Sequence, residues 1–200
     1  MKKEKIWIVS EYYYPIVTST GYYITEIAEH LATQRENINI ICTDAKYNEK
    51  DNFDFLKYEI RNLVKIHRVK SGNIDKNNFF YRTIRLFYSS ILLSIKLLLY
   101  AKKNDQVLVV TNPAFLILLM PLVKFFKGIK YKILVHDIFP ENLVAIEKMK
   151  STSFFYKLLK VAYDYSYSKA DICIAIGRDM KEVLSKKIKK SFEIIVIPNW

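Results

Sequence analysis

The sequence predicts an α/β protein with a Rossmann-like, doubly wound and mostly parallel sheet that carries helices on both faces. One observation is the alternation of apolar, strand-like runs with segments of helical periodicity along nearly the whole chain. Repeated strand–helix units of this kind connect parallel strands. A second observation is composition: 51% of the 200 residues are hydrophobic, which is enough for one substantial core.

The apolar periodicity places each element in turn. Strands are expected at residues 6–10, 38–42, 63–69, 106–110, 131–135, 171–176 and 194–197. Helices are expected at residues 21–32, 79–103, 114–126, 153–169 and 180–187. Residues 48–57 are polar and predict an irregular excursion, and the four glycines leave no flexible linker.

The charge balance narrows the class of partner. The net charge of +12 favours nucleic acid, a phosphorylated ligand or an anionic membrane surface. The basic residues are scattered and no recognition motif is present, so we expect no nucleic-acid partner. Cys42 and Cys173 lie in apolar strands and are expected to be buried free thiols. The four-residue apolar run near the N-terminus is too short for a signal peptide, so we expect a cytoplasmic protein.

Two segments are unusually apolar, residues 79–103 and 114–126. A bilayer span needs about 20 apolar residues, and neither segment reaches that uninterrupted, so we expect buried crossover helices. The first carries a narrow stripe within an arc of about 60°, made by Arg82, Arg85, Ser89, Lys96 and Lys103. The stripe is either the solvated face of a core helix or a membrane-facing surface on anionic headgroups. Interfacial anchors in the second case would be Phe79, Phe80, Tyr81 and Tyr88.

Polar residues follow several predicted strands at their carboxyl ends, where doubly wound sheets bind ligands. The turn Thr18-Ser19-Thr20-Gly21 precedes a helix, where it either caps the helix or also receives a phosphate. Neither the dinucleotide fingerprint nor the P-loop occurs, which disfavours the usual nicotinamide and ATP enzymes. No metal-ligand cluster is visible, so no metal is expected.

The most informative strand-to-turn segment is KILVHDIFPEN, residues 132–142. It places His136, Asp137 and Glu141 after an apolar strand, beside the Asn112 loop of the preceding strand. A histidine and two carboxylates at this position indicate a candidate catalytic site, although they could also cap the next helix.

Taken in order, the motifs resemble the N-terminal, acceptor-binding domain of a family 4 glycosyltransferase with the two-domain GT-B architecture. They are KIWIVSEYYYP with the STG turn, TEIAEHLA, NINIICTD, VLVVTNP, KILVHDIFPEN, YSKADICIAI and IIVIPNW. The turn at residues 137–142 is most similar to the subgroup that builds bacterial capsule and O-antigen, which includes N-acetylfucosamine transferases. The resemblance divides the chain into a domain of residues 1–197 and the start of a hinge at 198–200.

The resemblance implies a retaining, metal-independent hexosyltransferase that needs no cofactor. It would move a sugar from a UDP- or GDP-linked donor to a polyprenyl-diphosphate-linked acceptor at the inner face of the cell membrane. It implies catalytic roles for His136 and Asp137. Substrate contacts are implied for Ser19, Thr20, Gly21, Asn112 and Glu141. Many relatives have paired glycines where this chain has only Gly21, and Asp137 and Glu141 either touch the acceptor or brace their loop.

The donor-binding motifs of such enzymes lie beyond the hinge. The resemblance therefore implies a C-terminal donor-binding domain as partner, on the same chain or a separate one, and negligible transfer by these 200 residues alone. Two alternatives stay open: a non-catalytic, membrane-associated subunit of a split glycosyltransferase, and an unrelated α/β module that binds a phosphorylated ligand.

Overall fold

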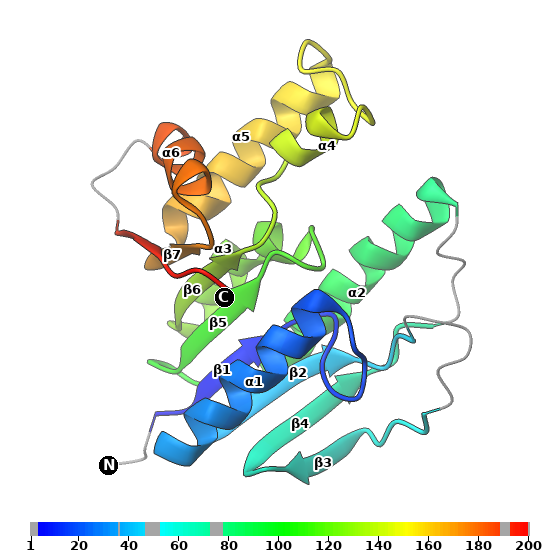
Figure 1. Ribbon diagram of the computed structural model, residues 1–200, viewed down its shortest axis with the longest axis vertical. Helices are drawn as coiled ribbons and strands as arrows, with labels where there is room; N and C mark the ends of the chain where they lie inside the picture. The colour runs from blue at the N-terminus through cyan, green and yellow to red at the C-terminus, as the bar shows by residue number, and fades with distance from the viewer. Residues whose placement is uncertain (1–3, 36, 47–52, 73–77, 189–192, 200) are drawn as a thin grey trace.

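The computed structural model describes residues 4–35, 37–46, 53–72, 78–188 and 193–199 (Figure 1). Its centre is one eight-stranded sheet with the strand order β3-β4-β2-β1-β5-β6-β7-β8. The strands are β1 (Ile6–Val9), β2 (Ile38–Thr43), β3 (Tyr58–Arg61), β4 (Val64–Val69), β5 (Gln106–Val110), β6 (Lys130–Val135), β7 (Ile172–Ala175) and β8 (Ile194–Val196). Every pairing is parallel except that of β3 with β4. The predicted doubly wound, mostly parallel sheet is confirmed.

Helices lie on both faces of the sheet, but unequally. They are α1 (Ser19–Gln34), α2 (Phe79–Tyr100), α3 (Leu116–Lys127), α4 (Glu141–Ala145), α5 (Phe154–Lys169) and α6 (Arg178–Lys187). The larger core packs α2, α3, α5 and α6 against one face. The smaller core packs α1 against the other, and α1 lies in front of the sheet in Figure 1. Strands of a parallel sheet are buried on both sides, and all six residues of β2 are buried.

The edge hairpin of β3 and β4 was not predicted. β3 alternates exposed and half-buried residues, as an edge strand does, and its short polar sequence merged with the excursion before it. The turn places Asn62 and Leu63 at positive φ of 46° and 66°, which suits a tight hairpin. Leu63 therefore belongs to the turn, and β4 begins at Val64. The predicted excursion of residues 48–57 lies partly outside the described residues.

The orientation of α2 corrects the predicted basic stripe. Arg85 and Ser89 face the sheet and are buried, and Lys96 is half-buried with its Nζ 3.4 Å from the carbonyl oxygen of Arg68. Both interpretations of the stripe turned these side chains outward, so both are wrong for Arg85, Ser89 and Lys96. Arg82 is exposed, and Lys103 is exposed beyond the C-cap at Ala101. The physical reason is a buried carboxylate beneath the helix, that of Glu11.

The outward side of α2 is apolar instead. Phe79, Phe80, Tyr81 and Tyr88 are all exposed, as expected of the predicted anchors. Of the helices that the structure describes, α2 has the length and composition to cross a membrane. In its apolar 18-residue stretch, 33% is buried inside the protein.

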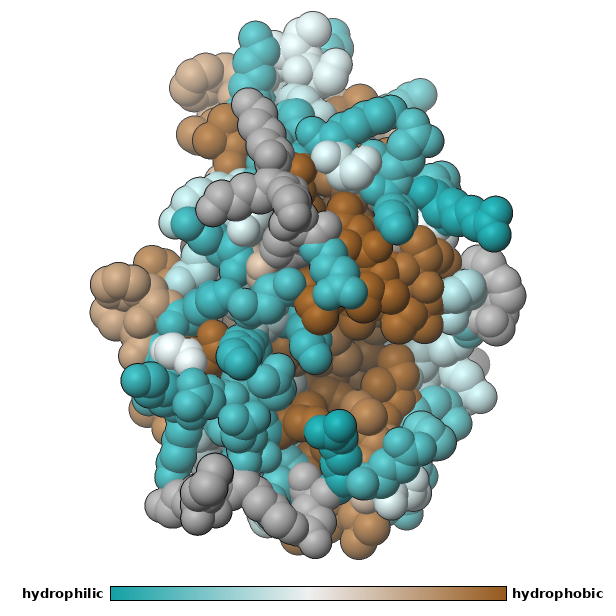
Figure 2. Space-filling view, turned by 90° about the vertical axis from the view of Figure 1, so that its left-hand side faces the viewer, coloured by the Kyte–Doolittle hydropathy of each residue, from teal (hydrophilic) through white to brown (hydrophobic). Residues whose placement is uncertain are grey.

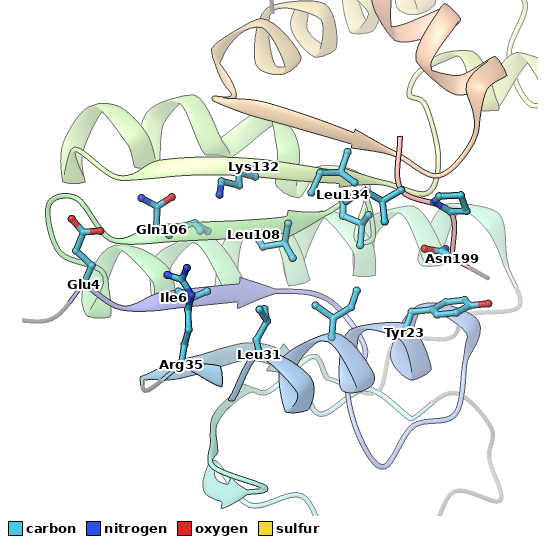
Figure 3. Close-up of a pocket in the computed structure, with 15 residues that line it drawn as sticks. Glu4, Ile6, Tyr23, Leu31, Arg35, Gln106, Leu108, Lys132, Leu134 and Asn199 are labelled. Atoms are coloured by element: carbon cyan, nitrogen blue, oxygen red, sulfur yellow. The ribbon is translucent and has the colours of Figure 1, made fainter. Parts of the chain in front are cut away.

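The α1 face of the sheet is open over β5, β6 and β7. A groove of about 710 Å³ lies there, between α1 residues such as Tyr23 and Leu31 and strand residues such as Leu108 and Leu134 (Figure 3). Figure 2 shows hydrophobic surface gathered in a hollow of the molecule. Asn199 lies at one end of the groove, and Glu4 and Arg35 lie at the other.

Candidate functional site

Polar side chains converge at the carboxyl ends of β1 and β5. They line a cavity of about 410 Å³, which we call the rim pocket. Its polar lining includes Glu11 after β1, Asn112 after β5, Ser19 and Thr20 at the start of α1, and Arg82 and Arg85 on α2. The predicted substrate residues Ser19, Thr20 and Asn112 are thus brought together, whereas Gly21, Asp137 and Glu141 are not in this lining.

A buried ion pair forms the floor of the rim pocket. Arg85 Nη1 donates to Glu11 Oε1 at 2.5 Å, and Arg85 Nη2 lies 3.4 Å from the Tyr12 hydroxyl. Burial raises the pKa of the Glu11 carboxyl, while the charge of Arg85 opposes that shift. The Nε of Arg85 has no hydrogen-bond partner within the described part of the chain. Sequence reasoning missed this pair, because its members are 74 residues apart and because polar residues on a helix are usually taken to face water.

The turn before α1 is a helix cap that also borders the rim pocket. Thr18 is the N-cap, and its side chain accepts a hydrogen bond from Gly21 N–H at 3.0 Å. A Cβ on Gly21 would come within 2.5 Å of the Ile16 carbonyl oxygen, so glycine is required for close packing of the turn. The Gly21 N–H is used by this cap, and a substrate contact of Gly21 stays a prediction. The capping interpretation of the turn is confirmed.

His136 lies next to the rim pocket, at the carboxyl end of β6. The Thr111 hydroxyl oxygen accepts hydrogen bonds from the backbone N–H groups of His136 and Asp137, at 3.0 and 3.1 Å. His136 Nδ1 lies 3.4 Å from Thr20 Oγ1, and Nε2 lies 3.5 Å from Asn199 Nδ2. An amide nitrogen can only donate, which favours the tautomer with the proton on Nδ1. Burial lowers the pKa of His136, with Asp137 opposing, so the ring is neutral near pH 7.

The two acidic residues of the turn brace their own loop. Asp137 is exposed, and its Oδ1 accepts from Asn142 Nδ2 at 3.0 Å. Glu141 accepts from Lys187 Nζ at 2.6 and 2.7 Å and from Lys160 Nζ at 3.2 Å. These contacts tie α4 to α5 and α6. They favour the bracing alternative for both carboxylates, and a catalytic role for Asp137 stays a prediction.

The geometry suits an anionic ligand. Arg82 is exposed at the pocket, and the first backbone N–H groups of α1 point out of the helix end.

Within the described ranges, no group of three His, Cys, Asp or Glu side chains could hold a metal ion. Cys42 and Cys173 are buried free thiols, as expected. Burial raises the pKa of each to about 12.

Comparison with known proteins decides the architecture. No protein-family model matches the chain. It is 32% identical over 200 residues to a protein named probable glycosyltransferase WbjE from Pseudomonas aeruginosa, covering 98% of this chain and 47% of that protein. It also superposes on sucrose-phosphate synthase from Thermosynechococcus elongatus with a TM-score of 0.64 and 12% identity, covering 98% of this chain and 48% of that one. The chain has the fold of one GT-B domain.

A second solved structure agrees with this GT-B assignment. It is the apo structure of OtsA, with a TM-score of 0.56, 12% identity, and coverage of 98% of this chain and 49% of that one. The predicted GT-B fold is confirmed. The chain spans about half the length of the relatives it matches.

Proposed function

We propose that this GT-B domain is the acceptor-binding half of a retaining glycosyltransferase of the bacterial surface-polysaccharide type. The complete enzyme would transfer a sugar from a nucleotide-sugar to a polyprenyl-diphosphate-linked acceptor in capsule, O-antigen or exopolysaccharide synthesis. The observation that carries the proposal is the rim pocket: a cavity with two arginines and a helix N-terminus, bordered by a neutral histidine. The relative named as a glycosyltransferase supports the reaction class, and similarity to N-acetylfucosamine transferases remains the proposed subtype.

The rim pocket fits the diphosphate of such an acceptor. Glu11 neutralises much of the charge of Arg85, whereas Arg82 is exposed at the mouth. The partial positive charge of the α1 N-terminus adds to Arg82, and its free N–H groups suit phosphate oxygens. Ser19, Thr20 and Asn112 supply neutral hydrogen-bonding groups around the same cavity.

His136 is placed to contact the reacting sugars rather than the phosphates. With Nδ1–H directed at Thr20, the neutral Nε2 would accept a hydrogen bond from a sugar hydroxyl that replaces the Asn199 amide. Its neighbour in the structure, Asn199, would belong to the proposed hinge at residues 198–200. A donor half that follows this segment would therefore meet the acceptor half beside His136.

The proposed donor half also accounts for the open groove. Parallel sheets are normally covered on both faces, yet β5, β6 and β7 lack a covering helix on the α1 side within the described chain. The relatives are about twice as long as this chain, so the proposed partner half has the material to cover the groove and to bind the UDP- or GDP-linked donor. If it does, Leu108→Glu would weaken association of the separately expressed halves, and unchanged association would refute this part.

The test of function uses a longer protein that joins this chain to a donor half. We expect His136→Ala to lower sugar transfer to a polyprenyl-diphosphate acceptor by about tenfold or more. The matched control is His30→Ala, because His30 is exposed on α1 and is hydrogen-bonded to Gln34 and Thr33 of the same helix. Near-normal turnover of His136→Ala would reject a role at the reacting centre, and measurable transfer by the 200-residue chain alone would contradict the half-site assignment.

A second candidate is a non-catalytic, membrane-associated subunit of a split glycosyltransferase. The exposed apolar side of α2 favours it. The same assay separates the two, because in a non-catalytic subunit His136→Ala would leave turnover unchanged.

A further inference from the structure

Three neighbouring helices share an apolar outer surface. α2 contacts α3, and α3 contacts α5. Their inner sides pack into one core against the sheet, through residues such as Leu93, Met120 and Tyr163. Their opposite sides, which we call the outer face, expose large apolar side chains, among them Phe80, Leu99, Phe125, Phe126, Phe154 and Val161.

The exposure on the outer face is extreme for side chains of this size. Leu99 is 74% exposed, Phe125 81% and Phe154 75%, and one comes from each helix. Scattered apolar side chains are normal on protein surfaces, but a contiguous patch of them marks an interaction surface.

The charge around the outer face has one sign. Apart from the buried Arg85, the three helices carry seven basic side chains and one acidic side chain, Asp164, which is paired with Lys160 and Lys187. Lys124 of α3 is paired with Asp171, which follows α5. Aromatic rings lie beside cations in two places: Lys169 Nζ of α5 is 5.1 Å from the Tyr165 ring, and Lys148 Nζ, between α4 and α5, is 5.7 Å from the Phe79 ring. Aromatic side chains with lysines beside them suit the level of lipid headgroups.

We propose that the outer face of α2, α3 and α5 rests on an anionic lipid surface, which makes this a peripheral protein of the inner face of the cell membrane. The face, rather than the basic stripe predicted from the sequence, is the contact. A second copy of the chain is a poorer occupant, because self-association would bring the same cations together.

The geometry excludes a spanning arrangement for these helices. Arg85, Ser89 and Ser94 of α2 are buried against the rest of the domain, so α2 cannot have lipid on all sides. α3 contains Pro121, and with 12 residues it is too short to cross a bilayer. Helices with one apolar side lie in the interface plane.

The same segment of α2 contributes to the outer face and to the rim pocket. Arg82 and Arg85 line the rim pocket, while Ile84, Phe87 and Tyr88 of the same helix segment are exposed. A lipid-linked diphosphate at headgroup level would then lie near this segment of α2. This consequence rests on the proposed acceptor, whereas the membrane contact itself does not.

Vesicle co-sedimentation of the 200-residue chain tests the proposal without any sugar transfer. We expect binding to vesicles of phosphatidylethanolamine and phosphatidylglycerol, and weaker binding to vesicles of phosphatidylcholine alone. A triple variant of the outer face, Leu99→Ser, Phe125→Ser and Phe154→Ser, should lower the partition coefficient by about tenfold or more.

The matched control removes three other exposed apolar groups from the β3–β4 side: Leu56→Ser, Ile60→Ser and Leu63→Ser. These side chains are 61%, 60% and 70% exposed, and their loss should leave binding unchanged. Circular dichroism of both triple variants should match the wild type, because every substituted position is exposed. Absence of vesicle binding, an equal loss in the control, or a dimer that the outer-face variant dissolves would overturn the proposal, and none of these would affect the His136 assay.

Discussion

α1 and α2 cover opposite faces of the same sheet with opposite polarity. α1 buries Ile24, Ala28 and Ala32 and exposes polar residues such as Glu26 and His30. α2 buries Arg85 and three serines together with two leucines, and exposes aromatic and aliphatic side chains. α1 therefore has the surface of a helix in water, and α2 has the surface of a helix that meets an apolar neighbour.

The difference shows that the environment on each side of a helix sets which residues it exposes. The inner side of α2 is polar because it supplies Arg85 to Glu11 beneath it. Its outer side is apolar because, in the proposed membrane-bound arrangement, lipid replaces water there. In this proposal one helix would connect the polar pocket to a membrane surface, and each side can be tested separately.

The largest expected effect is on the polar inner side of α2. Arg85→Ala leaves the carboxylate of Glu11 buried without its cation, and should lower the free energy of unfolding by about 3–5 kcal/mol. Arg82→Ala on the same helix is exposed and should change stability by less than about 0.5 kcal/mol, while weakening binding of inorganic diphosphate. Urea denaturation and calorimetric titration measure the two. Equal free energies of unfolding for the two variants would show that the buried carboxylate of Glu11 does not need the charge of Arg85.

The apolar sides of the two helices should respond differently to truncation. Ile24→Ala on α1 creates a cavity in the smaller core and should cost about 2–5 kcal/mol. Leu99→Ala on α2 removes an exposed side chain and should cost less than about 0.5 kcal/mol, yet weaken vesicle binding. Denaturation curves of both variants, with vesicle sedimentation of Leu99→Ala, test this. A large stability loss for Leu99→Ala would mean that the outer face is packed in the folded chain.

The smallest expected effect depends on pH at the contact between α2 and β4. His67 packs beside Tyr100 of α2, with ring centroids 5.1 Å apart. Burial, together with Lys96, Lys5 and Lys65, lowers the pKa of His67 to about 4 from 6.5. The unfolded chain then binds a proton that the folded chain does not, so stability is lost as pH falls from 6.5 to about 4. The full shift corresponds to about 3 kcal/mol. Because the ring is partly exposed to solvent, we expect a loss of about 1–2 kcal/mol, reduced in His67→Gln, in denaturation curves at a series of pH values. A flat profile for both proteins would contradict the assignment.

The sequence was sufficient for the parallel sheet and for part of the site, but β3 and α4 were not predicted. Apolar runs located the parallel strands, because both faces of such strands are buried. The polar strand ends located Asn112 and His136 at one rim. The sequence did not predict which buried polar groups pair with each other. Glu11 and Arg85 are 74 residues apart, and Thr111 Oγ1 accepts hydrogen bonds from two backbone N–H groups that follow the next strand of the sheet. Periodicity gives the direction of a helix's apolar side, and what lies against each side comes only from the fold.

Gly21 shows the same limit on a smaller scale. The turn at residues 18–21 was interpreted as a cap that could also receive a phosphate, whereas a Cβ on Gly21 would meet the carbonyl oxygen of Ile16. A position can require glycine because a Cβ would clash with the protein itself or because it would clash with a bound ligand. The sequence alone does not distinguish these two reasons.

The most direct test of the central claim measures transfer by the longer protein to two acceptors, one polyprenyl diphosphate embedded in anionic vesicles and one short-chain analogue free in water. The outer-face triple variant, Leu99→Ser, Phe125→Ser and Phe154→Ser, should lose about tenfold or more with the embedded acceptor and keep wild-type turnover with the soluble one. Arg82→Ala should lower turnover with both. If the outer-face variant treats the two acceptors alike, α2 does not connect the acceptor pocket to the membrane.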